Sequence, residues 1–229
     1  MRPGCIPATL LVIAKAPIAG FAKTRLTPPF SPRDAARLAA AALLDTLIDV
    51  RASGIQHRMV AWTGNLAEAQ EADTLADTLR DFTVVPQRGN TFGERLANAH
   101  ADAAHFGLPV LQIGMDTPQA GPELLARSAG HLVSSGDAVL GPAADGGWWA
   151  LGLTDPRPAR LLTEVPMSTS RTGDLTRAVV RRCGYRVHRL PILTDVDTYD
   201  DAVTVAAHSH GSFAATFGLL TAAATPALL

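Results

Sequence analysis

The chain has 229 residues, of which 47% are hydrophobic, and its formal net charge at pH 7 is −1. This length and composition suit one α/β domain over residues 1–229 with a substantial buried core. A net charge so near zero excludes a strongly basic protein that recruits nucleic acid or an anionic membrane through a global field. No apolar run approaches the ~20 residues that cross a bilayer, and the first residues lack a signal-peptide pattern, so we expect a soluble cytoplasmic protein.

Predicted strands and helices alternate along the chain. Strands are expected at residues 9–14, 58–63, 82–85, 110–113, 138–140, 148–153 and 185–190, the sixth of them as a candidate antiparallel strand. Helices are expected from Ser31-Pro32 to about Ser53-Gly54 and over residues 66–79, 93–106, 122–133, 175–183 and 199–208. This alternation predicts a three-layer α/β/α sandwich with a mainly parallel, Rossmann-like sheet. The tail after Gly218 has little to pack against and is expected to fray.

Several common sites are not predicted. Cys5 and Cys183 are the only cysteines, are far apart and have no metal-binding spacing, so we expect two reduced thiols. The histidines show no paired ligand spacing, which disfavours zinc. The chain also lacks the G-x-S-x-G turn of α/β-hydrolases and a G-x-G-x-x-G turn after the first strand, which disfavours NAD binding.

The loop after the first strand, residues 14–26, contains the most informative pattern. It places Lys15, Lys23 and Arg25 beside the turn-forming Gly20. Open α/β sheets bind ligands at the carboxyl ends of their strands, and small residues with cations suit a nucleotide phosphate. The alternative is a solvated loop without function. A P-loop is disfavoured because its two glycine positions hold Pro17 and Ala22.

Asp116 follows the fourth predicted strand, within Gly114-Met115-Asp116-Thr117-Pro118. A carboxylate at this edge of the sheet is well placed to hold Mg²⁺ (or Mn²⁺) against a diphosphate, because magnesium uses only one or two protein carboxylates. Gly114 leaves space beside it. The alternative is that Asp116 only caps the turn that follows.

Asp145 begins the turn Asp145-Gly146-Gly147 and precedes two tryptophans. Such a turn is common in hairpins, but an aromatic side chain beside a carboxylate could also stack a sugar or base. Successive strand side chains point to opposite faces, so at most one of Trp148 and Trp149 can face a site and the other belongs to the core. Asp145 is the candidate for orienting or deprotonating an acceptor hydroxyl.

A third acidic group lies at residues 195–201. Thr198 and Asp201 have the spacing of a helix capping box, which accounts for them without a function. Asp195 and Asp197 precede the helix, and either could complete a metal site with Asp116. We prefer Asp197 as the second ligand.

Two further polar loops are candidates. Residues 87–95, which contain two glycines and two arginines, open the helix after the third predicted strand, and we expect Arg88 and Asn90 to contact a nucleotide. Arg95 suits the same contact or a weak ion pair on its own helix. Residues 168–173 are interpreted as the cap of the following helix.

Together these patterns resemble the GT-A-fold nucleotide-diphospho-sugar transferase superfamily. Within it, the chain is similar to bacterial domains of unknown function described as glycosyltransferases. The resemblance rests on four segments in the expected order: A-K-x-P-x-x-G-x-x-K-T-R-L at residues 14–26, G-x-D-x-P at 114–118, G-P-x-x-D-G-G-aromatic at 141–148, and D-V-D-T at 195–198. Phospholactate guanylyltransferases share the K-T-R-L and D-V-D-T segments more distantly.

The resemblance implies a nucleotide over the first strands and Mg²⁺ on Asp116. Two departures stand out: Gln119 lies where the family often has an aspartate, and Trp148 replaces the usual tyrosine.

Three hypotheses follow from the residues and the resemblance. The first is a Mg²⁺-dependent glycosyltransferase that uses a nucleotide sugar. The second is a nucleotidyltransferase that joins a nucleoside triphosphate to a phosphorylated small acceptor, and the third is a non-catalytic nucleotide-binding domain. In the enzyme hypotheses, Lys15, Lys23 and Arg25 stabilise phosphate charge while Asp116 and Asp197 hold the metal. The expected partners are a nucleotide and a small-molecule acceptor, without nucleic acid or membrane, and a homodimer is left open.

Overall fold

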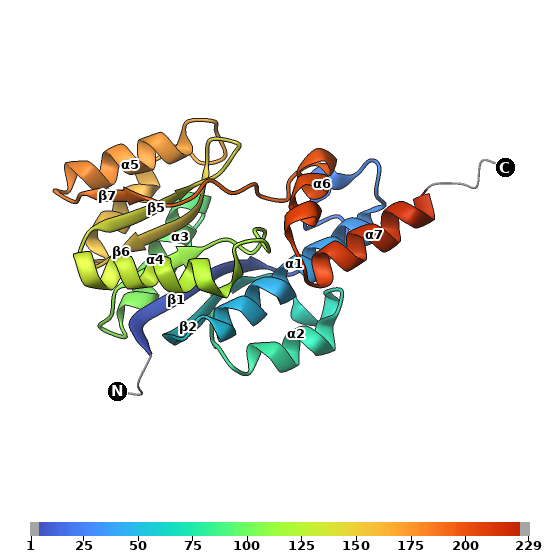
Figure 1. Ribbon diagram of the computed structural model, residues 1–229, viewed down its shortest axis with the longest axis horizontal. Coiled ribbons are helices and arrows are strands. Elements are labelled where there is room, and N and C mark those ends of the chain that lie inside the picture. The colour runs from blue at the N-terminus through green and yellow to red at the C-terminus, as the bar shows by residue number, and fades with distance from the viewer. Residues whose placement is uncertain (1–4, 225–229) are drawn as a thin grey trace.

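A computed structural model describes residues 5–224. In this part of the chain the strands form a seven-stranded sheet in the order β3-β2-β1-β4-β6-β5-β7 (Figure 1). Their bounds are β1 (Ile6–Lys15), β2 (Ile55–Thr63), β3 (Thr83–Pro86), β4 (Val110–Ile113), β5 (Ala138–Pro142), β6 (Trp148–Leu153) and β7 (Val187–Arg189). All neighbouring pairs are parallel except the two that involve β6, which runs antiparallel to β4 and β5. The predicted mainly parallel sheet, with 148–153 as its antiparallel strand, is therefore confirmed.

Helices cover both faces of the sheet. Their bounds are α1 (Pro32–Ala52), α2 (Ala72–Leu79), α3 (Phe92–Ala104), α4 (Gly121–Ser135), α5 (Thr172–Arg182), α6 (Tyr199–His208) and α7 (Ser212–Ala224), with 3₁₀ turns η1 (Thr24–Leu26), η2 (Leu66–Glu68) and η3 (Arg157–Glu164). The alternation of β1 explains the layering. Leu10 and Val12 pack in one cluster with α1, α2 and α4, whereas Leu11 and Ile13 pack in a second cluster with α3, η3 and α5.

A third apolar cluster lies beyond the end of the sheet, where α6 and α7 pack against α1 (Figure 1). It includes Leu26 and Phe30 of the loop after β1, together with Phe213 and Phe217 of α7. The first turn of α7 is capped from a distant helix, because the Asp45 carboxylate on α1 accepts the N–H groups of Ser212 and Phe213, each at 2.8 Å. The end of the chain thus helps to hold the loop that carries Lys23 and Arg25.

The predicted starts of two helices are confirmed, and the predicted capping residues form them. Ser31 caps α1 by accepting the Asp34 N–H, and Pro32 follows as the first helical residue. The capping box of Thr198 and Asp201 opens α6. Both cysteines are free thiols.

Other boundaries differ. The helix predicted over residues 66–79 is broken into η2 and α2, because Gln70 donates its N–H to the Pro17 carbonyl and Glu71 takes a left-handed φ of 57°. The strand predicted at 185–190 shortens to β7. The expectation of a frayed tail after Gly218 is wrong as far as Ala224, where α7 ends; Thr225 and Pro226 of that tail lie outside the described residues. None of the helices between residues 5 and 224 combines the length and apolar character needed to cross a membrane.

Candidate active site

A cleft of about 570 Å³ opens at the carboxyl ends of β1 and β4. The strand order reverses between these two strands, since β2 and β3 lie on one side of β1 and β4 lies on the other. In open α/β sheets such a switch point is where ligands bind. The sequence-predicted residues Lys15, Lys23, Arg25, Asp116, Asp145 and Asp197 all line this cleft.

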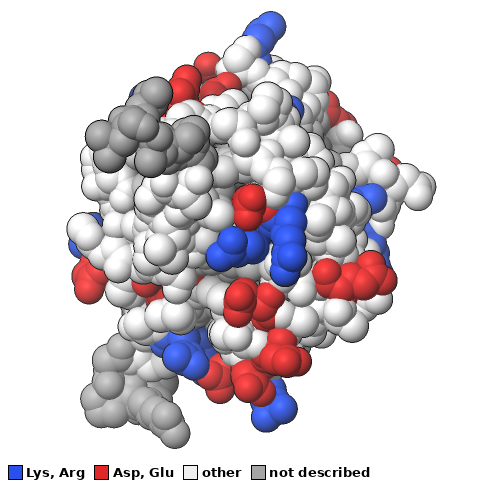
Figure 2. All heavy atoms as spheres, turned by 90° about the vertical axis from the view of Figure 1, so that its right-hand side faces the viewer, with Lys and Arg blue, Asp and Glu red and all other residues white. Residues whose placement is uncertain are grey.

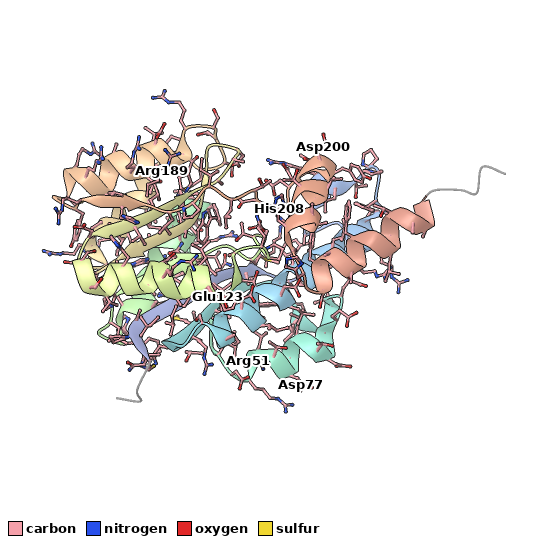
Figure 3. The ribbon with its side chains drawn as sticks, in the orientation of Figure 1. Arg51, Asp77, Glu123, Arg189, Asp200 and His208 are labelled. Carbon is pink, nitrogen blue, oxygen red and sulfur yellow. The ribbon has the colours of Figure 1, made fainter. Side chains whose placement is uncertain are left out.

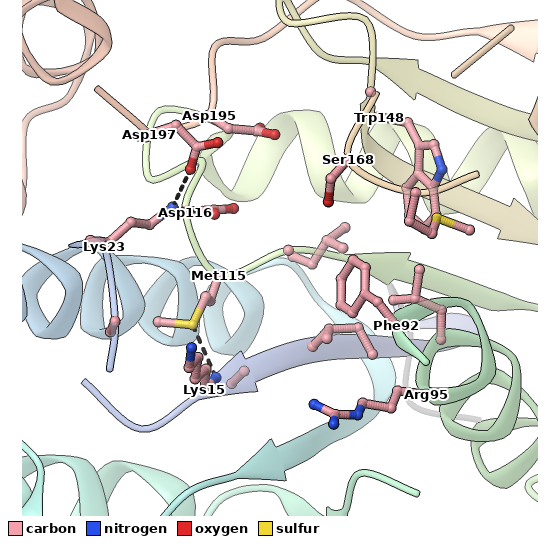
Figure 4. Close-up of a pocket in the computed structure, with 18 of the residues that line it drawn as sticks. Lys15, Lys23, Phe92, Arg95, Met115, Asp116, Trp148, Ser168, Asp195 and Asp197 are labelled. Carbon is pink, nitrogen blue, oxygen red and sulfur yellow. Dashed lines mark hydrogen bonds and ion pairs between the residues drawn. The ribbon is translucent and has the colours of Figure 1, made fainter. Parts of the chain in front are cut away.

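Lys23 joins three segments that are distant in sequence (Figure 4). Its Nζ lies 2.5 Å from Oδ2 of Asp116 and 3.0 Å from Oδ1 of Asp197. The residue has a left-handed φ of 51° at the start of η1, a conformation that non-glycine residues rarely adopt. Burial alone lowers the pKa of the Lys23 ammonium, but the two carboxylates more than reverse this and hold the pKa above its ordinary value. Lys23 is therefore a permanent cation between two acids.

Asp116 is presented at the end of β4 without a capping role. The first residue before α4 is Ala120, which makes no side-chain cap, and the Asp116 carboxylate bonds to Lys23 instead. A Cβ atom at Gly114 would lie 2.8 Å from the Asp116 carboxylate, so the glycine does leave the space that the sequence predicted. The Asp116 carbonyl accepts the Val196 N–H at 3.0 Å, which brings residues 195–197 to the same edge.

Asp197 and Asp195 have opposite electrostatic environments. Burial raises the pKa of Asp197, but Lys23 and Arg25 outweigh it, and the pKa falls below the ordinary range. Arg25 Nη1 lies 3.2 Å from the Asp197 carboxylate. Burial, together with the nearby Asp116 carboxylate, raises the pKa of Asp195 to about 8. Asp195 Oδ1 is buried without a hydrogen-bond partner. An orphaned buried carboxylate oxygen beside other acids is a costly arrangement that a bound cation would relieve.

The acidic end of the cleft fits a divalent metal ion in its donor chemistry. Within residues 5–224, no three His, Cys, Asp or Glu side chains are gathered as a metal site by themselves. Mg²⁺ and Mn²⁺ need only one or two carboxylates when phosphate oxygens and water complete the shell. Asp116, Asp195 and Asp197 all line the cleft, and their carboxylates have the oxygen-donor chemistry that such an ion prefers. Sequence reasoning gave Asp195 less weight than Asp197, and no local pattern distinguishes the two.

The turn that carries Asp145 packs closely against the loop before α5, through glycines on both sides. Gly173 donates its N–H to the Gly146 carbonyl at 2.8 Å, and a Cβ atom on Gly173 would lie 2.5 Å from the Gly147 carbonyl oxygen. Asp145 itself accepts the Gly147 N–H at 2.8 Å. Residues 168–173 do not cap α5 through a side chain, contrary to expectation, because Arg171 takes the cap position. Instead, the contact of Gly173 with Gly146 and Gly147 holds this part of the cleft wall in place.

Trp148 and Trp149 have different environments, as the alternation of side chains along a strand predicts. Trp149 is 1% exposed and lies in the core, whereas Trp148 lines the cleft near Ser168 (Figure 4). Ser168 has a left-handed φ of 59°. Lys23 and Ser168 are thus two non-glycine residues with positive φ on the wall of one cleft, a kind of local strain that concentrates at functional sites.

Three predicted nucleotide-binding residues are not among those that line the cleft. Gly20 serves the turn after β1 with a φ of 75°. Arg88 pairs with Asp102 at the rim of a separate shallow pocket beside β3. Asn90 donates its backbone N–H to Glu94, whose carboxylate folds back to close the capping box of α3. The N–H groups of Asn90 and Thr91 are therefore occupied by a side chain of the protein.

Other residues take their place in the cleft. Arg95 of α3, Phe92, Gln87 and Gln112 line it. Gln112 is fully buried and bonds to His100, and burial lowers the pKa of that histidine to about 4. No spacing in the sequence marks Gln112. Gln119, the departure from the family pattern, donates to the Thr194 carbonyl at 2.7 Å and does not line the cleft.

Comparison with known families decides the relationship. Residues 46–169, more than half of the chain, match a family described as an uncharacterized protein conserved in bacteria, DUF2064. The chain belongs to the DUF2064 family. No curated protein matches it.

Solved structures give this DUF2064 chain its wider context. A protein of Desulfovibrio desulfuricans G20 described as a nucleotide-diphospho-sugar transferase is 25% identical, with a TM-score of 0.77 and 94% of each chain covered. Rv0371c of Mycobacterium tuberculosis H37Rv, in complex with manganese, is 20% identical, with a TM-score of 0.51 over 87% of this chain and 97% of that one. A nucleotidyl transferase from Methanothermobacter is 17% identical, with a TM-score of 0.54 over 91% of this chain and 98% of that one. These likenesses establish the expected GT-A-like transferase fold.

Proposed function

We propose that this protein is a divalent-metal-dependent transferase that acts on a nucleotide-activated substrate, with a nucleotide sugar as donor. The observation that carries the proposal is the meeting of Lys23 with Asp116 and Asp197 at the switch point of the sheet. Cations and carboxylates placed together at such an edge are what a metal-bound diphosphate requires. The likeness to a nucleotide-diphospho-sugar transferase supports the choice of donor.

The residues have separate roles in this proposal. Asp116 and Asp197 would hold Mg²⁺ or Mn²⁺, and the ion would supply positive charge against the negative charge of the diphosphate. Lys23 holds the two carboxylates next to each other. Arg25, which is mostly exposed, reaches phosphate oxygens at the mouth of the cleft. Asp145 orients or deprotonates the acceptor hydroxyl, and Trp148 provides an apolar surface for the acceptor.

Nucleotidyl transfer is the second candidate. In that reaction the acceptor attacks the α-phosphorus of a nucleoside triphosphate and pyrophosphate leaves. In glycosyl transfer the acceptor attacks the sugar carbon and the nucleoside diphosphate leaves. Four cations line the cleft, namely Lys15, Lys23, Arg25 and Arg95, which suits the larger charge of a triphosphate.

The test is an assay of leaving groups. The protein is incubated with Mg²⁺ and either the four nucleoside triphosphates or a panel of nucleotide sugars, with simple alcohols and sugars as acceptors. Release of nucleoside diphosphate from a nucleotide sugar supports the proposal, and release of pyrophosphate supports the nucleotidyl alternative. The third hypothesis, a binding domain without catalysis, predicts nucleotide binding that depends little on metal and no release of either product.

A further inference from the structure

Two cations in the cleft have no acidic partner. Lys23 and Arg25 are paired with carboxylates, whereas neither Lys15 nor Arg95 forms an ion pair within the described residues. Figure 4 shows the Arg95 guanidinium pointing toward the side where Lys15 lies, away from the labelled aspartates Asp116, Asp195 and Asp197. The cleft therefore has an acidic pole, neutralised in part by Lys23, and a purely cationic pole.

Each cation of this second pole is held in place by the fold. Lys15 ends β1, and its Nζ lies 3.8 Å from the centre of the Phe21 ring. Gly64 lets Phe21 approach, since a Cβ atom there would lie 3.1 Å from the ring. Gln87 links the ends of β1 and β2 by donating to the carbonyls of Ala14 at 2.8 Å and Ala61 at 3.0 Å.

Arg95 is anchored through one N–H and leaves the rest of its guanidinium available. Its Nε donates to the Gly89 carbonyl at 3.2 Å. Within the described residues, Nη1 and Nη2 form neither a hydrogen bond nor an ion pair. The N–H groups before α3 are occupied by Glu94, so an anion at this pole would meet side chains rather than a helix end.

Like charges that face one cleft without a counterion raise each other's free energy. Burial and the nearby Arg95 guanidinium lower the pKa of Lys15, with a smaller contribution from Lys23. An oligophosphate anion would remove this repulsion and could form charge-assisted hydrogen bonds to both side chains.

We propose that Lys15 and Arg95 form a metal-independent binding site for the phosphate groups of an oligophosphate anion, separate from the acidic pole at Asp116 and Asp197. In assigning this anion to the substrate, the inference rests on the proposed function. The acidic pole then holds the metal, and the cationic pole holds the phosphates farthest from it.

The experiment is calorimetric titration of the full chain with inorganic pyrophosphate in EDTA. Wild-type protein should bind, and Arg95→Gln and Lys15→Met should each weaken binding by at least about tenfold. Arg51→Gln is the matched control, because Arg51 is an exposed arginine at the far end of α1 (Figure 3) and should bind like wild type. Arg95→Lys should retain part of the affinity, which separates a charge effect from misfolding, and circular dichroism checks the fold of each variant.

Two results overturn the proposal. One is an absence of pyrophosphate binding by wild-type protein in EDTA. The other is a binding constant for Arg95→Gln within twofold of that for Arg51→Gln. Parallel titrations with a nucleoside triphosphate and with glucose 1-phosphate identify the source of the phosphate, since tighter binding of one assigns the site to the nucleotide or to a phosphorylated acceptor.

Failure of this inference differs from failure of the proposed function. Asp116→Asn should leave pyrophosphate binding in EDTA intact while removing the effect of Mg²⁺ on nucleotide binding. Lost anion binding with intact metal-dependent turnover contradicts only the Lys15–Arg95 site. Intact anion binding without turnover of any nucleotide contradicts only the transferase.

Discussion

The Lys23 ammonium and the Asp116 carboxylate form an ion pair of 2.5 Å that joins the loop after β1 to the end of β4. The pair lies at the switch point of the sheet, between β1 and β4. Asp197, in the segment before α6, contacts the same ammonium. On the face of the molecule seen in Figure 2, basic and acidic side chains adjoin one another near the centre, and several acidic side chains gather below them. Around Lys23, the ammonium and the two carboxylates therefore offset one another's charge locally.

Removing Lys23 should destabilise the protein. Lys23→Met leaves Asp116 and Asp197 facing each other, and we expect the free energy of unfolding to fall by about 2 kcal/mol, below the range for fully buried pairs because both acids are partly exposed. Urea unfolding measures this. Arg25→Met is the matched control: its side chain is 68% exposed, and its loss should cost less than about 1 kcal/mol. Equal stability of the two variants would contradict the account.

The glycine contact behind Asp145 gives a steric prediction. In Gly173→Ala the new methyl group meets the Gly147 carbonyl, so the loop must move, and we expect a loss of about 1–3 kcal/mol. Gly130→Ala is the control, because Gly130 lies within α4 with nothing near its Cβ position. That change should stabilise the protein by about 0.5–1 kcal/mol. Thermal unfolding should therefore shift in opposite directions for the two variants.

Stability should also depend on the protonation of Asp49, on α1 away from the cleft. Burial, together with the Asp45 and Glu123 carboxylates, raises the pKa of Asp49 to about 6 from an ordinary value of 3.8; Figure 3 shows Glu123 at the start of α4. The folded state thus holds this proton more tightly than the unfolded state does. Its contribution to stability is fully present below pH 4 and is lost as the pH rises through 6.

Asp49→Asn removes this titration. Because the group is only half-buried, we expect the variant to gain about 1–2 kcal/mol over wild type between pH 4 and pH 8. Urea unfolding at several pH values measures the difference. A difference between the two proteins that does not change with pH would show that Asp49 is ionised normally.

The cap on α7 predicts a local effect. Asp45→Ala removes the acceptor for the Ser212 and Phe213 N–H groups, at a cost of about 1–2 kcal/mol. Amide exchange of α7 should accelerate more than that of β1. Asp45→Asn keeps one carbonyl acceptor, so the amide-exchange rate of α7 in this variant should lie between the rates in Asp45→Ala and in wild type. Unchanged exchange in α7 for Asp45→Ala would contradict the capping role.

Much of the fold could be predicted from the sequence because its rules act locally. The apolar run of β1, the caps at Ser31 and Thr198 and the alternation of Trp148 and Trp149 each depend on neighbouring residues. The candidate residues at strand ends were also predictable, because parallel strands bring their carboxyl ends to one edge.

The rest depends on contacts between distant residues. Lys23 meets an acid 93 positions away and Asp45 caps a helix 167 positions away, and no local pattern specifies either distance. Arg88 and Arg95 have the same chemistry and lie one short loop apart. In the fold, Arg95 lies in α3 and lines the cleft, whereas Arg88 pairs with Asp102 and does not line it.

The most direct test of the transferase proposal is nucleotide affinity with and without Mg²⁺ in Asp116→Asn. The account predicts that Mg²⁺ tightens nucleotide binding by wild-type protein and by the control Asp77→Asn, whose carboxylate is exposed on α2 (Figure 3). In Asp116→Asn this tightening should disappear and turnover should fall by about 10- to 100-fold. An Asp116→Asn protein that keeps both the metal effect and full turnover would contradict the central claim.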